Sequence, residues 1–320
     1  CNWPEIFTSL KKQKNAVKTM KEWEVIEGLH SIVAAPAADF NLSERYSRRT
    51  TRSMSRGSIM ACRATEWALQ DAGLINADWI HQGDMGIAYG SCAGDPNAVL
   101  EVASIAANRS TKALNATSYV RFMSHTAAVN IGVMFSITGR IITTSSACTS
   151  SSQAIGYAYE TIKNGYQRAM IAGGSEECSP ANTAVFDTLF AASTNFNYDT
   201  DNTPKPFDES RDGLVLGEGA GTLILEDLES ALARNATIYA EIVGFAINSD
   251  GRHITNPDAN RMAEVMRACL RDAKLQPQDI GYLNAHGTAT IPGDIAESQA
   301  VEAVFGNRVP VSTLKSYMGH

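Results

Sequence analysis

The sequence predicts an α/β fold on two observations. A short β-branched run at residues 141–144 is followed closely by helical spacing of apolar residues over 154–162. The stretch 68–74, at the end of one predicted helix, resembles the stretch 269–275, at the end of another, at an offset of 201 residues. Alternation of strands and helices is typical of α/β proteins, and the repeated stretch indicates two similar halves.

Length, composition and charge exclude several classes of protein. The chain has 320 residues, of which 44% are hydrophobic and 19% charged, which is typical of one large or two fused globular domains. A net charge of −7 at pH 7 argues against a nucleic-acid-binding protein. No apolar run approaches the length of a membrane span and the first residues carry no secretory signal, so we expect a cytoplasmic protein.

The six cysteines form neither a metal-binding nor a disulfide pattern. None belongs to a Cys-x-x-Cys pair or lies near a histidine at the spacing of zinc ligands, so we expect no metal site. In a chain of this size their number does not indicate a disulfide framework. Cys62 and Cys269 fall on apolar faces of predicted helices, where we expect core thiols.

The first part of the chain contains a predicted helix, an extended segment and a cluster of arginines. We expect a helix over residues 3–23 and a strand or extended loop over residues 31–40. Four arginines share the spacing of one helix face, with Arg48 beside them: Arg45, Arg49, Arg52 and Arg56. A solvated helix face and a docking surface for an acidic partner both explain this cluster, and both interpretations stay open.

Helices and strands alternate further along the chain. Residues 58–74 have two apolar faces and a narrow polar stripe, which predicts a mostly buried helix that ends near Gly73. His125 has no motif around it, so we expect a structural role. The glycines of residues 213–221 run into a strand, which indicates close packing and not a nucleotide-binding loop. Strands are also predicted at residues 85–89, 169–173 and 222–225, a helix at 97–107 and a polar loop at 193–206.

Cys148 lies where a predicted strand turns into a helix. Residues 141–144 indicate a buried strand, the next eight residues are small, and the helical pattern begins at Gln153. A thiol in this place meets the N–H groups and the positive end of the helix dipole, which lowers its pKa. Its backbone N–H can face an oxyanion, so the stretch favours a reactive cysteine over a core cysteine.

Two histidine motifs follow the ends of two further predicted strands. His286-Gly-Thr-Ala-Thr-Ile-Pro-Gly-Asp294-Ile-Ala-Glu297 follows apolar residues 280–283. Lys315-Ser-Tyr-Met-Gly-His320 follows residues 309–313. Sites in α/β folds are built at such strand ends. A cysteine with two such histidines combines a nucleophile with electrophilic groups.

In their order and spacing, the three motifs resemble those of the β-ketoacyl-acyl-carrier-protein synthases, the elongating condensing enzymes of fatty acid and polyketide synthesis. The resemblance runs from about residue 45 to the end of the chain and includes the segment from Arg211 to Gly221. It implies a thiolase-like fold, in which two duplicated α/β halves pack as five layers, αβαβα. We expect the first half to span residues 1–232 and the second to begin within residues 233–320.

The resemblance also predicts that the chain is a fragment. Members of this family begin with a glycine-containing strand ahead of Cys1 and continue past His320 with a helix and several strands. That later part carries a gating Phe and a glycine-rich loop with the second oxyanion N–H. We therefore expect an incomplete C-terminal half with unpaired sheet edges and exposed apolar surface.

The reaction implied by the resemblance is a decarboxylative Claisen condensation. Cys148 would take an acyl chain from acyl-carrier protein. Neutral His286 and His320 would hold the thioester oxygen of malonyl-carrier protein as carbon dioxide leaves. The same match assigns an active-site lysine and four supporting side chains: Lys315, Glu297, Asp294, Thr288 and Thr290. Ala289 departs mildly from the family, which often has Gly or Ser there.

The resemblance implies partners but no bound cofactor, because the phosphopantetheine arrives on the carrier protein. We expect acyl- and malonyl-loaded carrier protein as partners, the arginine cluster as their landing surface, and a homodimer. Cys148 and both histidines are present, so we favour an active elongating enzyme over a chain-initiating enzyme, a thiolase or a subunit without the cysteine. A polyketide or aryl-polyene pathway, and a non-catalytic partner subunit, stay open as alternatives to fatty acid synthesis.

Overall fold

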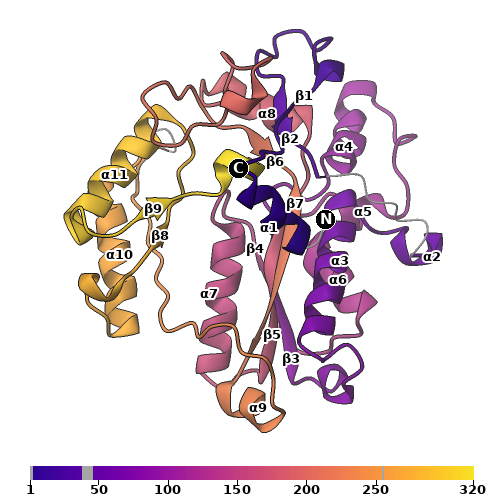
Figure 1. Cartoon of the computed structure of the whole chain (residues 1–320). Coiled ribbons are helices and arrows are strands. Elements are labelled where there is room, and N and C mark those ends of the chain that lie inside the picture. Colours follow the sequence, from indigo (N-terminus) through magenta and orange to yellow (C-terminus); the bar gives the residue numbers. More distant parts are fainter. Residues whose placement is uncertain (1–2, 38–45, 254–255) are drawn as a thin grey trace. The chain divides into compact units, whose positions relative to one another are not determined.

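The computed structural model describes residues 3–37, 46–253 and 256–320 (Figure 1). Two units are distinguished by their internal contacts. The cysteine unit comprises residues 40–177 and 219–242, and the histidine unit comprises residues 1–39, 178–218 and 243–320. Both units combine segments that are far apart in the sequence, whereas the predicted halves divide the chain at residue 232. No helix in the described ranges is long and apolar enough to cross a bilayer.

A four-stranded sheet in the order β4-β3-β5-β7 forms the centre of the cysteine unit. Its strands are β3 (Met85–Gly90), β4 (Ile141–Thr144), β5 (Ala169–Glu176) and β7 (Gly219–Glu226). β3 pairs with β4 and β5 in parallel, and β7 pairs with β5 antiparallel. The helices of this unit are α2 (Arg48–Thr51), α3 (Arg56–Asp71), η2 (Asp78–His81, a 3₁₀ helix), α4 (Pro96–Asn108), α5 (Ser118–Arg121), α6 (Thr126–Met134), α7 (Ser150–Lys163) and α9 (Leu228–Ala233).

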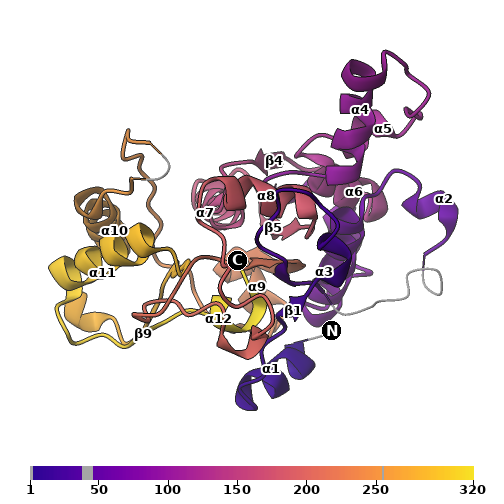
Figure 2. The same cartoon turned by 90° about the horizontal axis from the view of Figure 1, so that it is seen from above.

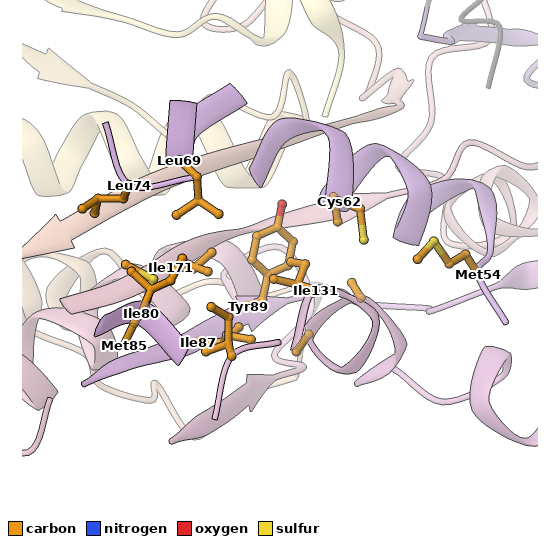
Figure 3. Packing of buried hydrophobic residues seen from close by; sticks show 14 of the residues in the cluster. Met54, Cys62, Leu69, Leu74, Ile80, Met85, Ile87, Tyr89, Ile131 and Ile171 are labelled. Carbon is orange, nitrogen blue, oxygen red and sulfur yellow. The ribbon is translucent and has the colours of Figure 1, made fainter. Parts of the chain in front are cut away.

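Alternate residues of β3 and β5 point to opposite faces of this sheet, and each face has its own apolar cluster. Met85, Ile87 and Tyr89 pack with side chains of α3 and α6, including Cys62 and Leu69 (Figure 3). On the other face, Ala88, Met170 and Ala172 pack with Ala154 and Ala158 of α7. Figure 1 shows α7 on one side of the sheet and α3 and α6 on the other. The buried core position of Cys62 is as predicted.

The strand β4 corrects one prediction. Residues 141–144 do form a strand, but it lies at the edge of the sheet and only Thr144 is buried. Ile141 is 45% exposed, because an edge strand has a neighbour on one side only. A β-branched run therefore predicted the strand correctly but not its burial.

The histidine unit contains two small sheets, a packed helix pair and several further short helices. One sheet has the order β1-β2-β6, with β1 (Lys18–Thr19), β2 (Val33–Ala35) and β6 (Leu216–Gly217). The other pairs β8 (Leu283–Asn284) in parallel with β9 (Val311–Ser312). The helices of this unit are α1 (Trp3–Lys11), η1 (Lys21–Trp23), α8 (Pro180–Thr188), η3 (Thr200–Asn202), α10 (Ala259–Ala273), η4 (Pro277–Asp279), α11 (Ile291–Phe305) and α12 (Lys315–Met318).

Helices α10 and α11 lie side by side (Figure 2). Leu270 of α10 packs with Val301 and Phe305 of α11, and Leu283 of β8 lies against this cluster. The parallel pair β8–β9 brings the carboxyl ends of both strands to the same edge. Both histidine motifs begin at this edge, as the sequence predicted.

The repeated stretch lies at equivalent places in the two units. In the cysteine unit, α3 is followed by the 3₁₀ helix η2 and then β3. In the histidine unit, α10 is followed by the 3₁₀ helix η4 and then β8. The shared order of elements agrees with the predicted duplication.

The predicted helix over residues 3–23 is wrong in its length. The helix α1 ends at Lys11, and Gln13 has a left-handed backbone conformation with φ of 53°. The chain then becomes extended, and Lys18 and Thr19 pair with Ala34 and Val33. Pairing with a distant strand overrides the local helical tendency.

Candidate active site

The loop that carries Cys148 is a tight turn between β4 and α7. Ala147 has a left-handed φ of 52°, which is strained for a residue with a Cβ. The hydroxyl of Ser150 accepts a hydrogen bond from the Ser146 N–H at 2.9 Å and donates one to the Ala147 carbonyl at 2.7 Å. These bonds hold the turn that presents Cys148, whose residue is exposed.

The helix behind this loop lies unusually close to two strand ends. The helix α7 begins at Ser150, three residues before the predicted start at Gln153. A Cβ on Gly90, the last residue of β3, would lie 2.6 Å from the Ser150 carbonyl oxygen. A Cβ on Gly174 of β5 would overlap the Ser151 hydroxyl. Glycine at both positions lets the N-terminus of α7 approach the carboxyl ends of the parallel strands.

A half-buried glutamate that the sequence reasoning missed supports the neighbouring loop. The Glu176 carboxylate, at the end of β5, accepts the backbone N–H groups of Cys92 at 2.5 Å and Ala93 at 3.2 Å. The Cys92 carbonyl in turn accepts a hydrogen bond from the Ser145 hydroxyl at 3.3 Å. Burial raises the pKa of Glu176. Its place three residues after the apolar strand 169–173 was the sequence signal for this role.

The remaining described cysteines are poor nucleophiles. Burial raises the pKa of Cys62 and Cys178 to about 12. Burial also raises the pKa of Cys92 and Cys269, with nearby acidic groups acting in the same direction. Because a thiolate is the reactive form, these shifts disfavour reaction at all four.

Two carboxylates of α11 hold the loop that carries His286. Glu297 accepts the His286 N–H at 2.7 Å and the Gly287 N–H at 2.8 Å, one on each oxygen. Asp294 accepts the Ala289 N–H at 3.1 Å. Both carboxylates are buried. The supporting residues Glu297 and Asp294 therefore act on the backbone of the histidine loop.

The two predicted threonines contact each other in the same loop. The hydroxyl oxygens of Thr288 and Thr290 are 2.9 Å apart, and Thr290 is the residue that precedes α11. Between them, the buried Ala289 has a left-handed φ of 65°. Glycine at this position would adopt such a backbone with less strain than alanine does.

His320 is held by its backbone next to His286. Its N–H donates to the Val215 carbonyl at 2.8 Å, and its carbonyl accepts the Gly217 N–H at 2.9 Å. The His286 and His320 rings are 5.2 Å apart between centroids, with an interplanar angle of 77°. The Nε2 atom of His320 is buried and has no hydrogen-bond partner within the described residues.

Both histidines are neutral at pH 7. Desolvation is the largest cause that lowers the pKa of His286, to about 3, although the residue keeps exposed surface. Lys315 and His320 lower it further. Desolvation and then Lys315 lower the pKa of His320 to about 4. Lys315, the first residue of α12, thus acts electrostatically on both rings, and its place in the active site stays a prediction.

The predicted arginine face does not form. Ser47 and Ser55 each cap the start of a separate helix, since their side chains accept the Thr50 and Ser58 N–H groups. Arg48 and Arg49 lie on α2, Arg52 ends it, and Arg56 begins α3. Arg48, Arg49 and Arg52 are exposed and Arg56 is half-buried, while Arg45 lies outside the described residues. The single-helix arrangement was therefore wrong, and the docking role of these arginines stays a prediction.

The structure groups the predicted site residues within their units. His286, His320 and Lys315 lie in the histidine unit with Glu297, Asp294, Thr288 and Thr290. Cys148 and the described arginines lie in the cysteine unit. His125 precedes α6 as its N-terminal flanking residue, without a side-chain capping bond.

Two family models match nearly the whole chain. "Beta-ketoacyl synthase, N-terminal domain" matches residues 3–231, and "Beta-ketoacyl synthase, C-terminal domain" matches residues 239–320. Among curated proteins, the chain is similar to 3-oxoacyl-acyl-carrier-protein synthase 1 of Haemophilus influenzae. The two are 32% identical over 321 residues, covering 100% of this chain and 78% of that protein.

Solved structures give the same result for the fold. A crystal structure of a β-ketoacyl synthase from Burkholderia phymatum has a TM-score of 0.97 and 51% identity, covering 100% of this chain and 78% of that one. The chain is also similar to a structure of a type II polyketide synthase acyl-carrier protein in complex with its ketosynthase. The TM-score is 0.87 and the identity 28%, covering 99% of this chain and 78% of that one. The α/β fold class predicted from the sequence is confirmed.

Proposed function

The chain belongs to the β-ketoacyl synthase family of thiolase-like condensing enzymes, and on this basis we propose that it joins an acyl group on Cys148 to the two-carbon unit of a malonyl thioester. The observation that carries the proposal is the pair of neutral histidines with ring centroids 5.2 Å apart. Two neutral imidazoles can each donate one N–H to a developing oxyanion without holding a positive charge.

The first step is transfer of the acyl chain to Cys148. The thiolate attacks the carbonyl carbon of an acyl-carrier thioester, and the carrier's sulfur leaves as a thiol after taking a proton. The exposed position of Cys148 on a tight turn supports this role, because an incoming carbonyl can reach the sulfur. The raised pKa of the other described thiols leaves Cys148 as the favoured nucleophile.

The second step is loss of carbon dioxide from the malonyl unit. The bond between its methylene carbon and its carboxylate breaks, and the electron pair passes to the thioester oxygen as an enolate. The N–H groups of His286 and His320 hold this oxygen. The enolate carbon then attacks the acyl carbonyl on Cys148, a carbon–carbon bond forms, and the cysteine thiolate leaves. The buried, unpartnered Nε2 of His320 supports this role.

The partner of this chemistry is an acyl-carrier protein, loaded first with an acyl chain and then with a malonyl group. Support comes from the complex of a similar ketosynthase with its carrier protein. We propose no resident cofactor. We also propose a cytoplasmic homodimer, and light scattering tests the dimer. The pathway is fatty acid synthesis, with polyketide synthesis as the alternative that the same complex favours.

A two-readout assay tests this function. Release of labelled carbon dioxide from malonyl-carrier protein reports the second step, and the mass of the intact chain after incubation with acyl-carrier protein reports acylation. His286→Ala and His320→Ala should each lower carbon dioxide release at least about 100-fold, because removal of one oxyanion donor costs that much. Acylation of Cys148 should persist in both variants.

The assay also separates the alternatives. Unchanged carbon dioxide release in both histidine variants would refute the paired role. Absence of acylation and release in the unmodified chain would favour a non-catalytic partner subunit. Faster condensation with β-keto acyl chains than with saturated chains would assign the chain to polyketide synthesis.

A further inference from the structure

A buried ion pair joins the histidine loop to a segment about 80 residues earlier. The Nε atom of Arg211 lies 3.4 Å from an Asp294 carboxylate oxygen. The Arg211 side chain is 11% exposed and the Asp294 side chain 1% exposed. Both residues belong to the histidine unit. Arg211 had no assigned role in the sequence analysis.

Asp294 connects the two segments through its two oxygens. One oxygen accepts the Phe207 N–H at 2.7 Å and the other accepts the Ala289 N–H at 3.1 Å. Ala289 is held in its left-handed conformation, three residues after His286. The carboxylate therefore fixes the backbone of the histidine loop against the segment that contains Phe207.

The guanidinium group of Arg211 also donates hydrogen bonds to the same loop. Its guanidinium donates to the carbonyls of Thr290 at 3.4 Å and Ile291 at 3.2 Å, where α11 begins. Another nitrogen donates to the Asp208 carbonyl at 2.7 Å, within its own segment. One side chain thus ties three backbone carbonyls and one carboxylate together, which a lysine ammonium cannot reproduce in this geometry.

Packing next to His286 adds to this connection. A Cβ on Gly287 would lie 3.1 Å from the Phe207 ring and 2.6 Å from a methyl carbon of Thr313. The Phe207 side chain therefore packs closely against Gly287, the residue that follows His286. A shift of the Phe207–Arg211 segment would be transmitted to the His286 backbone.

We propose that Arg211 is a positioning residue for decarboxylation, because it and Asp294 set the place of His286. This inference rests on the proposed function, in which His286 holds the enolate oxygen. Acylation takes place on Cys148, which belongs to the cysteine unit and not to the histidine loop. Loss of Arg211 should therefore affect decarboxylation more than acylation. A misplacement of about 1 Å is enough to cost a large factor in rate.

The test compares the two steps in full-chain variants. Arg211→Gln should lower carbon dioxide release from malonyl-carrier protein at least about tenfold and leave acylation by acyl-carrier protein within about twofold. Arg211→Lys should recover only part of the loss. In Arg211→Ala, added guanidinium at millimolar concentration should restore carbon dioxide release. Arg261→Gln is the matched control, because Arg261 pairs with Glu264 at 2.6 Å in the same unit but is 52% exposed.

The outcomes are distinguishable. Retention of carbon dioxide release in His286→Ala would refute the proposed function itself. Loss in His286→Ala with wild-type release in Arg211→Gln would refute only the positioning role. Equal losses of acylation and release would mean that Arg211 is merely structural. If Arg211→Gln does not fold, Arg211→Lys and the guanidinium rescue of Arg211→Ala give the same comparison. The positioning role would then be refuted if Arg211→Lys had wild-type kinetics and guanidinium did not restore carbon dioxide release in Arg211→Ala.

Discussion

At the scale of single residues, the surroundings of each cysteine thiol determine its pKa. Cys92 is exposed, like Cys148, yet burial of its thiol, Glu176 and Cys148 all raise its pKa. Reactivity therefore depends on what surrounds each sulfur atom and not on exposure alone.

Iodoacetamide at neutral pH should label Cys148 first. We expect a rate above that of every other described cysteine, because burial raises the pKa of those four thiols and so lowers their thiolate fraction. Peptide mass spectrometry over a time course gives the rates, and Cys148→Ala shows the background. Faster labelling of Cys92 or Cys178 would contradict the assignment of the nucleophile.

The pKa values of the two histidines make stability depend on pH. Unfolded imidazoles take up protons near pH 6.5, whereas the pKa values of folded His286 and His320 are lowered to about 3 and about 4. Their contribution to stability is therefore complete above about pH 6.5 and is lost as the pH falls towards 4. Thermal unfolding at pH 8, 6.5 and 5 should show this decline.

Removal of the nearby cation should weaken this dependence. Lys315→Met should raise the pKa of both histidines, because Lys315 lowers both. Nuclear magnetic resonance titration of the imidazole carbons measures the shift directly, with Lys12→Met at an exposed residue just after α1 as the control. Identical titration curves in Lys315→Met and the wild-type chain would show that burial alone lowers these pKa values.

At the scale of elements, the turn between β8 and α11 favours a small side chain, or none, at the position of Ala289. The residue is 0% exposed with a φ of 65°, so a β-branched side chain would be both crowded and strained. Ala289→Val should destabilise the chain by about 2 kcal/mol or more, whereas Ala289→Gly should change stability by less than about 1 kcal/mol.

A helical alanine supplies the control for this prediction. Ala303 lies on α11 and is exposed, and there glycine should cost more than valine, because glycine is the poorer helix former. Denaturant unfolding of the four variants gives the two rankings. The same ranking at both positions would show that the backbone conformation of Ala289 does not matter.

Local patterns predicted the elements around the site but not what holds them together. The strands at residues 85–89 and 169–173 and the helix 97–107 were found because their apolar spacing is local. Ser47 and Ser55, which cap two separate helices, are also local signals, and they determine the structure there more than the spacing of the arginines does. In contrast, the bond from Asp294 to the Phe207 backbone joins residues 87 apart, and no local pattern specifies it.

At the scale of the whole molecule, the net charge of −7 opposes an acidic carrier protein. Docking therefore needs a local cationic surface, and Arg48, Arg49 and Arg52 offer one on and beside α2. Arg49→Glu with Arg52→Glu should raise the KM for acyl-carrier protein several-fold and flatten its dependence on salt, with little effect on a small pantetheine thioester.

A second double variant with the same change in net charge, made away from the arginines, is the control for docking. Lys12→Glu with Lys14→Glu also takes the chain from −7 to −11, on exposed residues of the histidine unit. If both double variants raise the KM equally, net charge and not the arginine surface governs the encounter. Equal losses with the pantetheine thioester would make the arginines structural.

The interleaving of the two units sets an order on their assembly during synthesis. All strands of the sheet beside Cys148 have left the ribosome once residue 226 has emerged. One contact of the first segment waits far longer, because the Ala16 N–H donates to the Tyr317 carbonyl at 2.7 Å. On a growing chain, the thiol is therefore in place before the two imidazoles, and the Ala16 N–H lacks its partner until residue 317 has emerged.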